Sequence, residues 1–487
     1  MEGLLKIFEK QASINKDKIA IVCGGKKLSY EEIYFKAYDL SIFFKNEGLK
    51  FGDKVIIKSE ETPYYWAIYF ATLLADGVFI SLDKNIPDNS FLSNINELGG
   101  CFVYISNSHI SNSDYKHFSY EEIISKTKTS VMDRKYDLYH DIEPDRLTQI
   151  IYTTGTTGKS KGVKWPYNYQ LESSFDHKEL PYNQNTIIAI VAPMDHTLAN
   201  GRTMTTILNG GTVLQFNDLL NLEFFYNQLD KYGVNSFVLT PSAIKYLSLI
   251  SYEHFKRACR NSIFFEIGGE KMPKNSQESL LQLAPNAQLF IGYAATECGP
   301  IGFYEFSKFG TTDNRVRKVD DKPEFILFNE NYESIGTPKN INGYIGIKKN
   351  FKYLGYYNSL ITNLQIKDGY IILSDYGHID EDGFLCLDGR DGETIISGGY
   401  KINPIEVENV CLKYNGVDEC VCYGTSNEIF GKIVTLDVVC NSSIDKNELN
   451  DFLLKNLEIN KVPKIINFVD KIEKNKMGKI DRKFYRR

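Results

Sequence analysis

A segment rich in glycine, hydroxyl and lysine side chains, YTTGTTGKSKGV at residues 152–163, has the composition of a phosphate-binding loop. A P-loop needs a glycine, four free positions and then Gly-Lys-Ser or Gly-Lys-Thr, but Thr153 stands where that first glycine belongs. Gly155 is too close to Gly158 to form the P-loop nest of backbone N–H groups. The segment still follows a strand-like run, LTQIIYTT, and it offers flexible glycines, hydroxyl donors and two lysines. It fits a polyanion loop outside the P-loop class or, equally well, an ordinary surface loop.

Composition restricts the class of protein. The 487 residues suggest about three domain-sized units. Lysine and arginine number 56 against 62 aspartates and glutamates, a net charge of −6, so nothing overall recruits nucleic acid or an anionic membrane. The longest apolar run, residues 64–82, is interrupted by Asp76-Gly77 and predicts a buried helix, a turn and a strand rather than a membrane span. We therefore expect a soluble protein with no membrane or nucleic-acid partner.

Cysteine usage favours a reducing compartment. The nine cysteines include no Cys-x-x-Cys pair and no zinc-type cluster. Cys420 and Cys422 are two positions apart in a strand-like run, so they share a face and are expected to be packed thiols rather than a redox pair. A cytoplasmic location fits this pattern.

The order of elements predicts an α/β fold with several parts. Apolar strands alternate with helix-sized intervals through about residue 300, which indicates two parallel-type αβ subdomains. From about 300 to 390 the strands become short and are separated by Gly, Asp and Asn, as expected of an antiparallel β-barrel-like subdomain or a meander. The last stretch, about 95 residues, returns to helices and longer strands and is expected to form a small α+β domain.

Further segments share a family order with the glycine-rich loop. They are GGEKMP (268–273), GYAATECGP (292–300), SDYGHIDEDGFLCLDGR (374–390), SGGYKINPIEVE (397–408) and MGKIDRK (477–483). In this order the segments resemble the adenylate-forming superfamily of acyl- and aryl-CoA ligases, stand-alone adenylation domains and luciferases. The resemblance covers essentially the whole chain and is thinnest between about 303 and 370. It implies an N-terminal ATP- and acyl-binding domain (1–389), a hinge (390–392) and a mobile C-terminal lid domain (393–487).

The resemblance assigns most of the nucleotide contacts. The β- and γ-phosphates of ATP would lie against Thr153, Thr154, Gly155, Thr156, Thr157, Gly158 and Lys161. The adenine side would be formed by Gly268, Gly269, Glu270 and the ring of Tyr293, for which plain core packing is the alternative. Asp375 would accept the ribose hydroxyls, and Arg390 would link the ribose to the hinge. Thr154, Ser160, Ser374 and the hinge residue Gly392 depart from the family pattern, and a glycine at the hinge would allow freer pivoting.

The implied chemistry is attack of a carboxylate on the α-phosphate of ATP, which gives an acyl adenylate and pyrophosphate. Because two anions must meet, the reaction needs Mg²⁺, cations and oriented donors more than a base. Glu297 would face Mg²⁺ and Thr296 would donate to the α-phosphate. Lys479, on the small domain, would neutralise both reactants. That domain would then rotate, removing Lys479 and bringing the Gly398-Gly399 loop to the thiol.

The acyl pocket is expected near residues 192–203 and 268–296. His196 matches a histidine that lines the carboxylate pocket of the ligases, although a helix-capping role is an alternative. Asp195 could instead pair with the amine of an amino acid, as in adenylation domains, although one alignment gives that position to Thr197. We favour a carboxylic acid without an amine, with a thiol acceptor in trans, either CoA or the phosphopantetheine of a carrier protein. The alternatives are a stand-alone amino-acid adenylation enzyme and a catalytically silent binding protein of the same fold.

Overall fold

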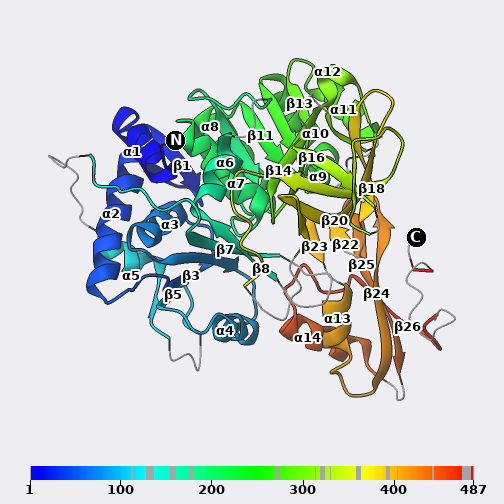
Figure 1. The fold of residues 1–487 in the computed structure, drawn as a ribbon. Coiled ribbons are helices and arrows are strands. Elements are labelled where there is room, and N and C mark those ends of the chain that lie inside the picture. Colours follow the sequence, from blue (N-terminus) through cyan, green and yellow to red (C-terminus); the bar gives the residue numbers. More distant parts are fainter. Residues whose placement is uncertain are drawn as a thin grey trace. The chain divides into compact units, whose positions relative to one another are not determined.

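The structure of the protein is a computed structural model. It describes residues 2–110, 115–127, 136–153, 161–175, 179–269, 272, 274–312, 314–318, 324–329, 331–357, 364–390, 395–402, 404–440, 444–473 and 484–485. The chain divides into two compact units (Figure 1). The first comprises Met1–Lys84, Ile95–Tyr152 and Gly162–Gly389, and the second comprises Asn85–Asn94, Thr153–Lys161 and Arg390–Arg487. Within these described ranges, no helix has both the length and the apolar character needed to cross a bilayer.

The first unit contains an eight-stranded sheet that is parallel except at its two ends. Its central strands are buried and mostly apolar, as expected when helices cover both faces, with Glu266 as a buried charge on one of them. Only the outermost strands at each end, β2 (Lys26–Ser29) and β14 (Gly299–Glu305), pair antiparallel with their neighbours. In spatial order the strands are β14 (Gly299–Glu305), β13 (Gln288–Ala295), β12 (Phe264–Ile267), β11 (Ser236–Leu239), β9 (Ile187–Val191), β10 (Thr212–Phe216), β1 (Ile19–Cys23) and β2 (Lys26–Ser29).

A second sheet carries the strands on either side of the glycine-rich segment. Neighbouring strands from β6 to β7 are parallel. The apolar run at 64–82 forms α3 (Tyr65–Leu74) and β4 (Val78–Asp83) with a turn at Asp76, so the expected helix, turn and strand are confirmed. In spatial order the strands are β6 (His117–Phe118), β5 (Val103–Ile105), β3 (Lys54–Ser59), β4 (Val78–Asp83), β7 (Leu147–Thr153) and β8 (Lys161–Pro166).

Several helices of the first unit begin where the sequence supplies a capping side chain. Ser29 and Glu32 form a reciprocal capping box at the start of α2, and Thr240 caps α9 ahead of a proline in its first turn. The helices are α1 (Leu4–Ile14), α2 (Tyr30–Asn46), α3 (Tyr65–Leu74), α5 (Tyr120–Ser125), α6 (Tyr167–Phe175), α7 (Thr197–Leu208), α8 (Leu222–Tyr232), α9 (Pro241–Ile250), α10 (Tyr252–Arg260), α11 (Lys274–Leu283) and α12 (Phe306–Phe309).

The third sheet is antiparallel, as the short strands predict. Its described strands follow an open path whose end strands do not pair with each other, so the meander alternative fits and barrel closure does not. Alternating short strands specify antiparallel pairing, but they do not specify whether the first and last strands meet. In spatial order the strands are β15 (Arg315–Lys318), β21 (Phe384–Arg390), β20 (Tyr370–Ile379), β18 (Gly343–Lys348), β16 (Phe325–Phe328) and β17 (Ser334–Gly336), with β19 (Ile366–Lys367) beside β20.

The second unit has the expected α+β character. A long hairpin, β24 (Val417–Asn427) and β25 (Gly431–Cys440), is flanked by β22 (Ile395–Ser397), β23 (Tyr400–Ile402) and β26 (Ile465–Phe468). Its helices are α13 (Pro404–Cys411) and α14 (Lys446–Asn456), and it also contains most of α4 (Asp88–Glu97), whose last residues belong to the first unit. Cys420 and Cys422 are both buried in one hydrophobic cluster, so the prediction of packed thiols is confirmed.

Candidate active site

The end of β13 brings two predicted nucleotide residues together. The Tyr293 hydroxyl donates to Asp375 Oδ2 at 2.8 Å, although the two residues are 82 positions apart. Both side chains are buried, and the Tyr293 ring packs in a hydrophobic cluster beneath the third sheet. The tyrosine therefore combines core packing with a contact that orients the carboxylate predicted to hold the ribose.

Thr296 is held on two sides. Its carbonyl oxygen accepts from Trp165 Nε1 at 2.8 Å and from the Tyr169 hydroxyl at 3.1 Å. These two rings stack with centroids 4.0 Å apart, and they come from β8 and α6, just after the glycine-rich segment. The Thr296 side chain shares a hydrogen bond of 2.9 Å with the Thr197 hydroxyl at the start of α7. The backbone and hydroxyl of Thr296 thus have fixed positions.

Glu297 is oriented by a tyrosine from a distant segment. The Tyr356 hydroxyl donates to Glu297 Oε1 at 2.7 Å. Burial raises the pKa of Tyr356, and the neighbouring Glu297 charge raises it further, so the hydroxyl remains a donor. Backbone bridging of Tyr356 to Val163 on β8 fixes this segment.

The chemistry of Glu297 fits magnesium. A carboxylate oxygen is a ligand that Mg²⁺ prefers, and the ion commonly takes one or two carboxylates together with phosphate oxygens and water. Among the described residues no group of three His, Cys, Asp or Glu side chains could form a complete protein site. A site shared with nucleotide phosphates is the arrangement that this donor set suits.

His196 and Asp195 lie at the start of α7. His196 occupies the N-cap position but makes no side-chain capping hydrogen bond, which weakens the purely capping alternative. Its Nε2 is 3.9 Å from Asp195 Oδ2, and the Asp195 side chain is only 10% exposed. A β-carbon on Gly268 would lie 3.4 Å from Leu198, so the beginning of α7 lies against the end of β12.

The predicted adenine loop begins with two glycines after β12. Gly268 donates its backbone N–H to the Leu239 carbonyl at 3.2 Å. Gly269 has a φ of 88°, a conformation that glycine adopts without steric cost. Glu270 lies outside the described residues.

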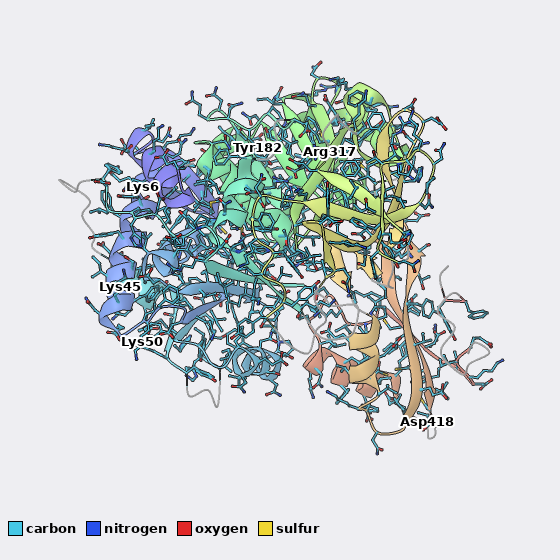
Figure 2. All side chains as sticks on the ribbon, viewed as in Figure 1. Lys6, Lys45, Lys50, Tyr182, Arg317 and Asp418 are labelled. Atoms are coloured by element: carbon cyan, nitrogen blue, oxygen red, sulfur yellow. The ribbon has the colours of Figure 1, made fainter. Side chains whose placement is uncertain are left out.

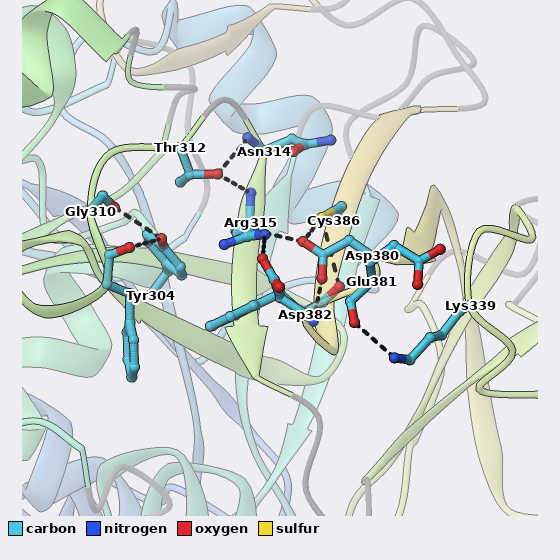
Figure 3. Close-up of polar contacts among 12 residues, drawn as sticks. Tyr304, Gly310, Thr312, Asn314, Arg315, Lys339, Asp380, Glu381, Asp382 and Cys386 are labelled. Carbon is cyan, nitrogen blue, oxygen red and sulfur yellow. Dashed lines mark hydrogen bonds and ion pairs between the residues drawn. The ribbon is translucent and has the colours of Figure 1, made fainter.

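A braced turn follows the strand of Asp375. The Arg315 Nε donates to Asp380 Oδ2 at 2.6 Å, and the same guanidinium also binds Asp382 (Figure 3). Burial alone raises the pKa of Asp380, but the Phe384 amide and Arg315 together lower it, so the carboxylate stays charged. A β-carbon at Gly377 would lie 2.4 Å from the Cys386 carbonyl, which shows how closely β20 and β21 approach. This hairpin gives Asp375 a rigid support.

Several predicted residues lie outside the described residues: Thr154, Gly155, Thr156, Thr157, Gly158, Glu270, Gly392 and Lys479. The side chains of Thr153 and Arg390 also lie outside the description, although Thr153 ends β7 and Arg390 ends β21. Lys161 begins β8, the neighbour of β7, so the predicted phosphate loop joins two adjacent strands. In the second unit, Gly398 and Gly399 form the turn between β22 and β23, with φ of 56° and 84°.

Sequence reasoning missed Tyr356, Trp165 and Tyr169. Trp165 and Tyr169 follow the glycine-rich segment closely, and aromatic donors there could have been suspected. Tyr356 lies in the stretch where the family resemblance is thinnest, and no spacing rule connects it with Glu297.

Comparison with known proteins identifies the family. Residues 8–357 match the AMP-binding enzyme family, and residues 406–479 match the AMP-binding enzyme C-terminal domain. A 2-succinylbenzoate–CoA ligase of Staphylococcus epidermidis is 24% identical over 98% of this chain and 96% of its own length. A long-chain-fatty-acid–CoA ligase of Bacillus subtilis is 23% identical over 99% of this chain and 93% of its own length.

A solved structure agrees in fold. The o-succinylbenzoate CoA synthetase of Bacillus subtilis, as a double mutant with a product analogue, superposes with a TM-score of 0.85 at 20% identity. The match covers 99% of this chain and 98% of that one. Together with the two matched domains, these findings show that the chain belongs to the AMP-binding enzyme family and is an AMP-forming ligase.

Proposed function

We propose that this protein activates a carboxylic acid without an amine to an acyl adenylate, releases pyrophosphate and transfers the acyl group to the thiol of CoA. The observation that carries the proposal is the convergence at the end of β13, where Tyr293 binds Asp375, Thr296 is fixed from both sides and Glu297 is oriented by Tyr356. A ribose carboxylate, a phosphate donor and a metal carboxylate are what an adenylating site requires.

Each of these residues has one part in the first half-reaction. An oxygen of the acid attacks the α-phosphorus, and the bond to the bridging oxygen of pyrophosphate breaks. Asp375 accepts the ribose hydroxyls and fixes the α-phosphate position, while the Thr296 hydroxyl donates to that phosphate. Glu297, together with phosphate oxygens, would hold Mg²⁺, which would supply charge neutralisation. Lys479 adds an ammonium between the two anions.

The second half-reaction moves the acyl group from AMP to sulfur. The thiol sulfur attacks the acyl carbon, AMP leaves through its phosphate oxygen, and the thiol proton passes to solvent. We place Gly398 and Gly399 beside the thiol, and a hinge at 390–392 between the states with and without Lys479. The turn geometry of the two glycines supports a close backbone approach to a ligand.

CoA is the leading acceptor because the relatives are named CoA ligases. The acid-without-amine assignment has the same support, because neither 2-succinylbenzoate nor a fatty acid carries an amine. Asp195 leaves an amino acid as the second candidate, since a buried carboxylate beside the carboxylate pocket could pair with an ammonium. In that case a carrier-protein phosphopantetheine would replace CoA.

A panel of aromatic, aliphatic and amino acids tests the proposal by ATP–pyrophosphate exchange, followed by addition of CoA or carrier protein. We expect exchange with amine-free acids and thioester formation with CoA. Exchange driven only by amino acids would favour the second candidate, and no exchange with any acid would refute both. Lys479→Ala should abolish exchange and leave thiolysis of a supplied acyl adenylate largely intact.

A further inference from the structure

A buried ion pair lies between α7 and β12, beside the predicted acyl pocket. Arg202 Nε is 2.6 Å from Glu266 Oε1, and the two side chains are 4% and 1% exposed. The Tyr182 hydroxyl donates to the other oxygen, Glu266 Oε2, at 2.9 Å (Tyr182 is labelled in Figure 2). Burial and the charge of Glu266 both raise the pKa of Tyr182, which keeps its proton in place. We call Arg202, Glu266 and Tyr182 the polar floor.

The guanidinium of the polar floor has unused donors. Of its five N–H groups, only the one on Nε has an acceptor among the described residues, and Nη1 is buried with no such partner there. The Phe303 ring lies 5.2 Å from the guanidinium carbon and covers one of its faces. Leaving buried N–H groups without acceptors destabilises the fold, and a buried ion pair adds little stability by itself. Stability alone therefore does not account for the pair.

The polar floor lies more than one helical turn beyond the reacting end of the site. Arg202 follows Thr197, the partner of Thr296, by five residues of α7, a rise of about 7.5 Å. Glu266 precedes Gly268 by two residues of strand, roughly 6.6 Å. An acid whose carboxyl group lies at Thr296 would thus reach the polar floor with a ring or a short chain.

Two glycines show how much room there is beside the polar floor. A β-carbon on Gly201, the neighbour of Arg202 in α7, would meet no heavy atom within 4 Å, so this side of the helix is open. A β-carbon on Gly292 would lie 3.0 Å from Phe303 and 3.5 Å from Glu266 Oε1, so β13 approaches the polar floor closely. Both glycines belong to the segments in which the acyl pocket is expected.

We infer that the polar floor closes the acyl pocket and selects compact acids whose far end carries an acceptor oxygen, a carbonyl or a second carboxylate. This inference rests on the proposed function. The planar guanidinium of Arg202 presents paired N–H donors whose geometry suits such oxygens. An acceptor oxygen of the substrate at the polar floor would bind the N–H groups that have no acceptor among the described residues. An alkyl end would leave them buried and unpaired, so long-chain fatty acids are poor substrates.

The experiment compares sets of three aromatic acids of equal length whose side chains end in a carboxylate, a ketone or a methyl group. For the wild-type protein we expect kcat/KM in pyrophosphate exchange to favour either oxygen-ended acid by roughly 100-fold or more, because a site built for hydrogen bonding rejects an analogue that lacks the partner. The carboxylate and ketone arms separate charge recognition from hydrogen bonding. Thermal protection by each acid, without ATP, gives a readout independent of turnover.

The variant Arg202→Met with Glu266→Leu replaces the pair by apolar side chains, a change that is often neutral or stabilising. We expect the preference for oxygen-ended acids to disappear while the methyl-ended acid is still activated. Lys461→Met with Glu406→Met and Glu458→Met removes a partly buried ion-pair cluster of the second unit, without leaving an unpaired charge, and should leave the preference unchanged. If the double variant does not fold, Arg202→Lys is tested instead. Lysine keeps the positive charge but lacks the paired N–H donors of the guanidinium, so the kcat/KM ratio of oxygen-ended to methyl-ended acids should fall about tenfold.

Equal use of methyl-ended and oxygen-ended acids by the wild-type protein would overturn the inference and leave the proposed function intact. A preference that survives in the folded double variant, or in Arg202→Lys if that is the variant tested, would also overturn it. Absence of exchange with every acid would instead refute the proposed function.

Discussion

Replacing Tyr356 by phenylalanine removes one hydroxyl and almost no volume. The lost contact is the 2.7 Å hydrogen bond to Glu297 Oε1, with Tyr356 itself 4% exposed. A hydrogen bond to a charged acceptor contributes about 1.5–3 kcal/mol, but Glu297 is only partly buried and water can replace the donor. We therefore take the lower bound, about 1.5 kcal/mol, which corresponds to roughly a tenfold change in an equilibrium constant.

The tenfold effect should appear in the metal dependence. Pyrophosphate exchange, measured as a function of Mg²⁺ at saturating ATP and acid, should need about ten times more Mg²⁺ for half-maximal rate. The KM for the acid should be unchanged, because Tyr356 is outside the two segments in which the acyl pocket is expected and its hydroxyl binds Glu297. Binding of Mn²⁺ in the ATP complex, measured by electron paramagnetic resonance, should weaken by a similar factor.

Tyr357 provides a matched control. Its hydroxyl donates to the Leu98 carbonyl at 2.9 Å, so Tyr357→Phe removes a hydroxyl from the next residue without touching Glu297. The reasoning is refuted if Tyr356→Phe shows the wild-type Mg²⁺ dependence, or if both variants shift it equally.

Three further predictions concern stability. Burial raises the pKa of Glu9, but hydrogen bonds from Lys6, Tyr34 and backbone amides outweigh this effect and lower the pKa overall. The Glu9 carboxylate therefore stabilises the fold above its unfolded pKa, and this contribution is lost as the pH falls. Glu9→Gln should therefore be less stable than wild type near pH 7 in urea unfolding, with a gap that shrinks below about pH 4.5. Gly377→Ala would bring a β-carbon within 2.4 Å of the Cys386 carbonyl, so we expect the free energy of unfolding to fall by about 3 kcal/mol. Gly201→Ala, where the β-carbon meets no atom, is the control and should leave the free energy of unfolding nearly unchanged. Lys461→Met leaves Glu406 and Glu458 without their cation, so the free energy of unfolding, measured with a chemical denaturant, should fall by about 3 kcal/mol. An unfolding midpoint equal to that of the wild-type protein would contradict this reasoning.

Strand periodicity predicted the parallel sheets well. The strand-like run that ends at Thr153 folds as β7 and pairs parallel with β4. Motif order also named both members of the pair Tyr293 and Asp375 before any contact was known. Local sequence carries this information because period, capping and turn residues act over a few positions.

Contacts between distant segments could not be predicted. Tyr356 reaches Glu297 across 59 positions and Arg202 reaches Glu266 across 64, and both depend on which strands are neighbours. The register shift between Tyr293 and Ala294 on β13 is also invisible in the sequence. The open third sheet shows the same limit, since strand closure depends on tertiary packing.

The two tryptophans of the chain have very different surroundings. Trp66 is fully buried in α3, whereas the indole N–H of Trp165 binds the carbonyl of Thr296. In a Trp66→Phe background, the tryptophan fluorescence, excited selectively over that of the tyrosines, would come from Trp165 alone. Its emission would then report, without any attached label, how nucleotide and acid rearrange the backbone at Thr296, so the protein contains its own optical probe of adenylation.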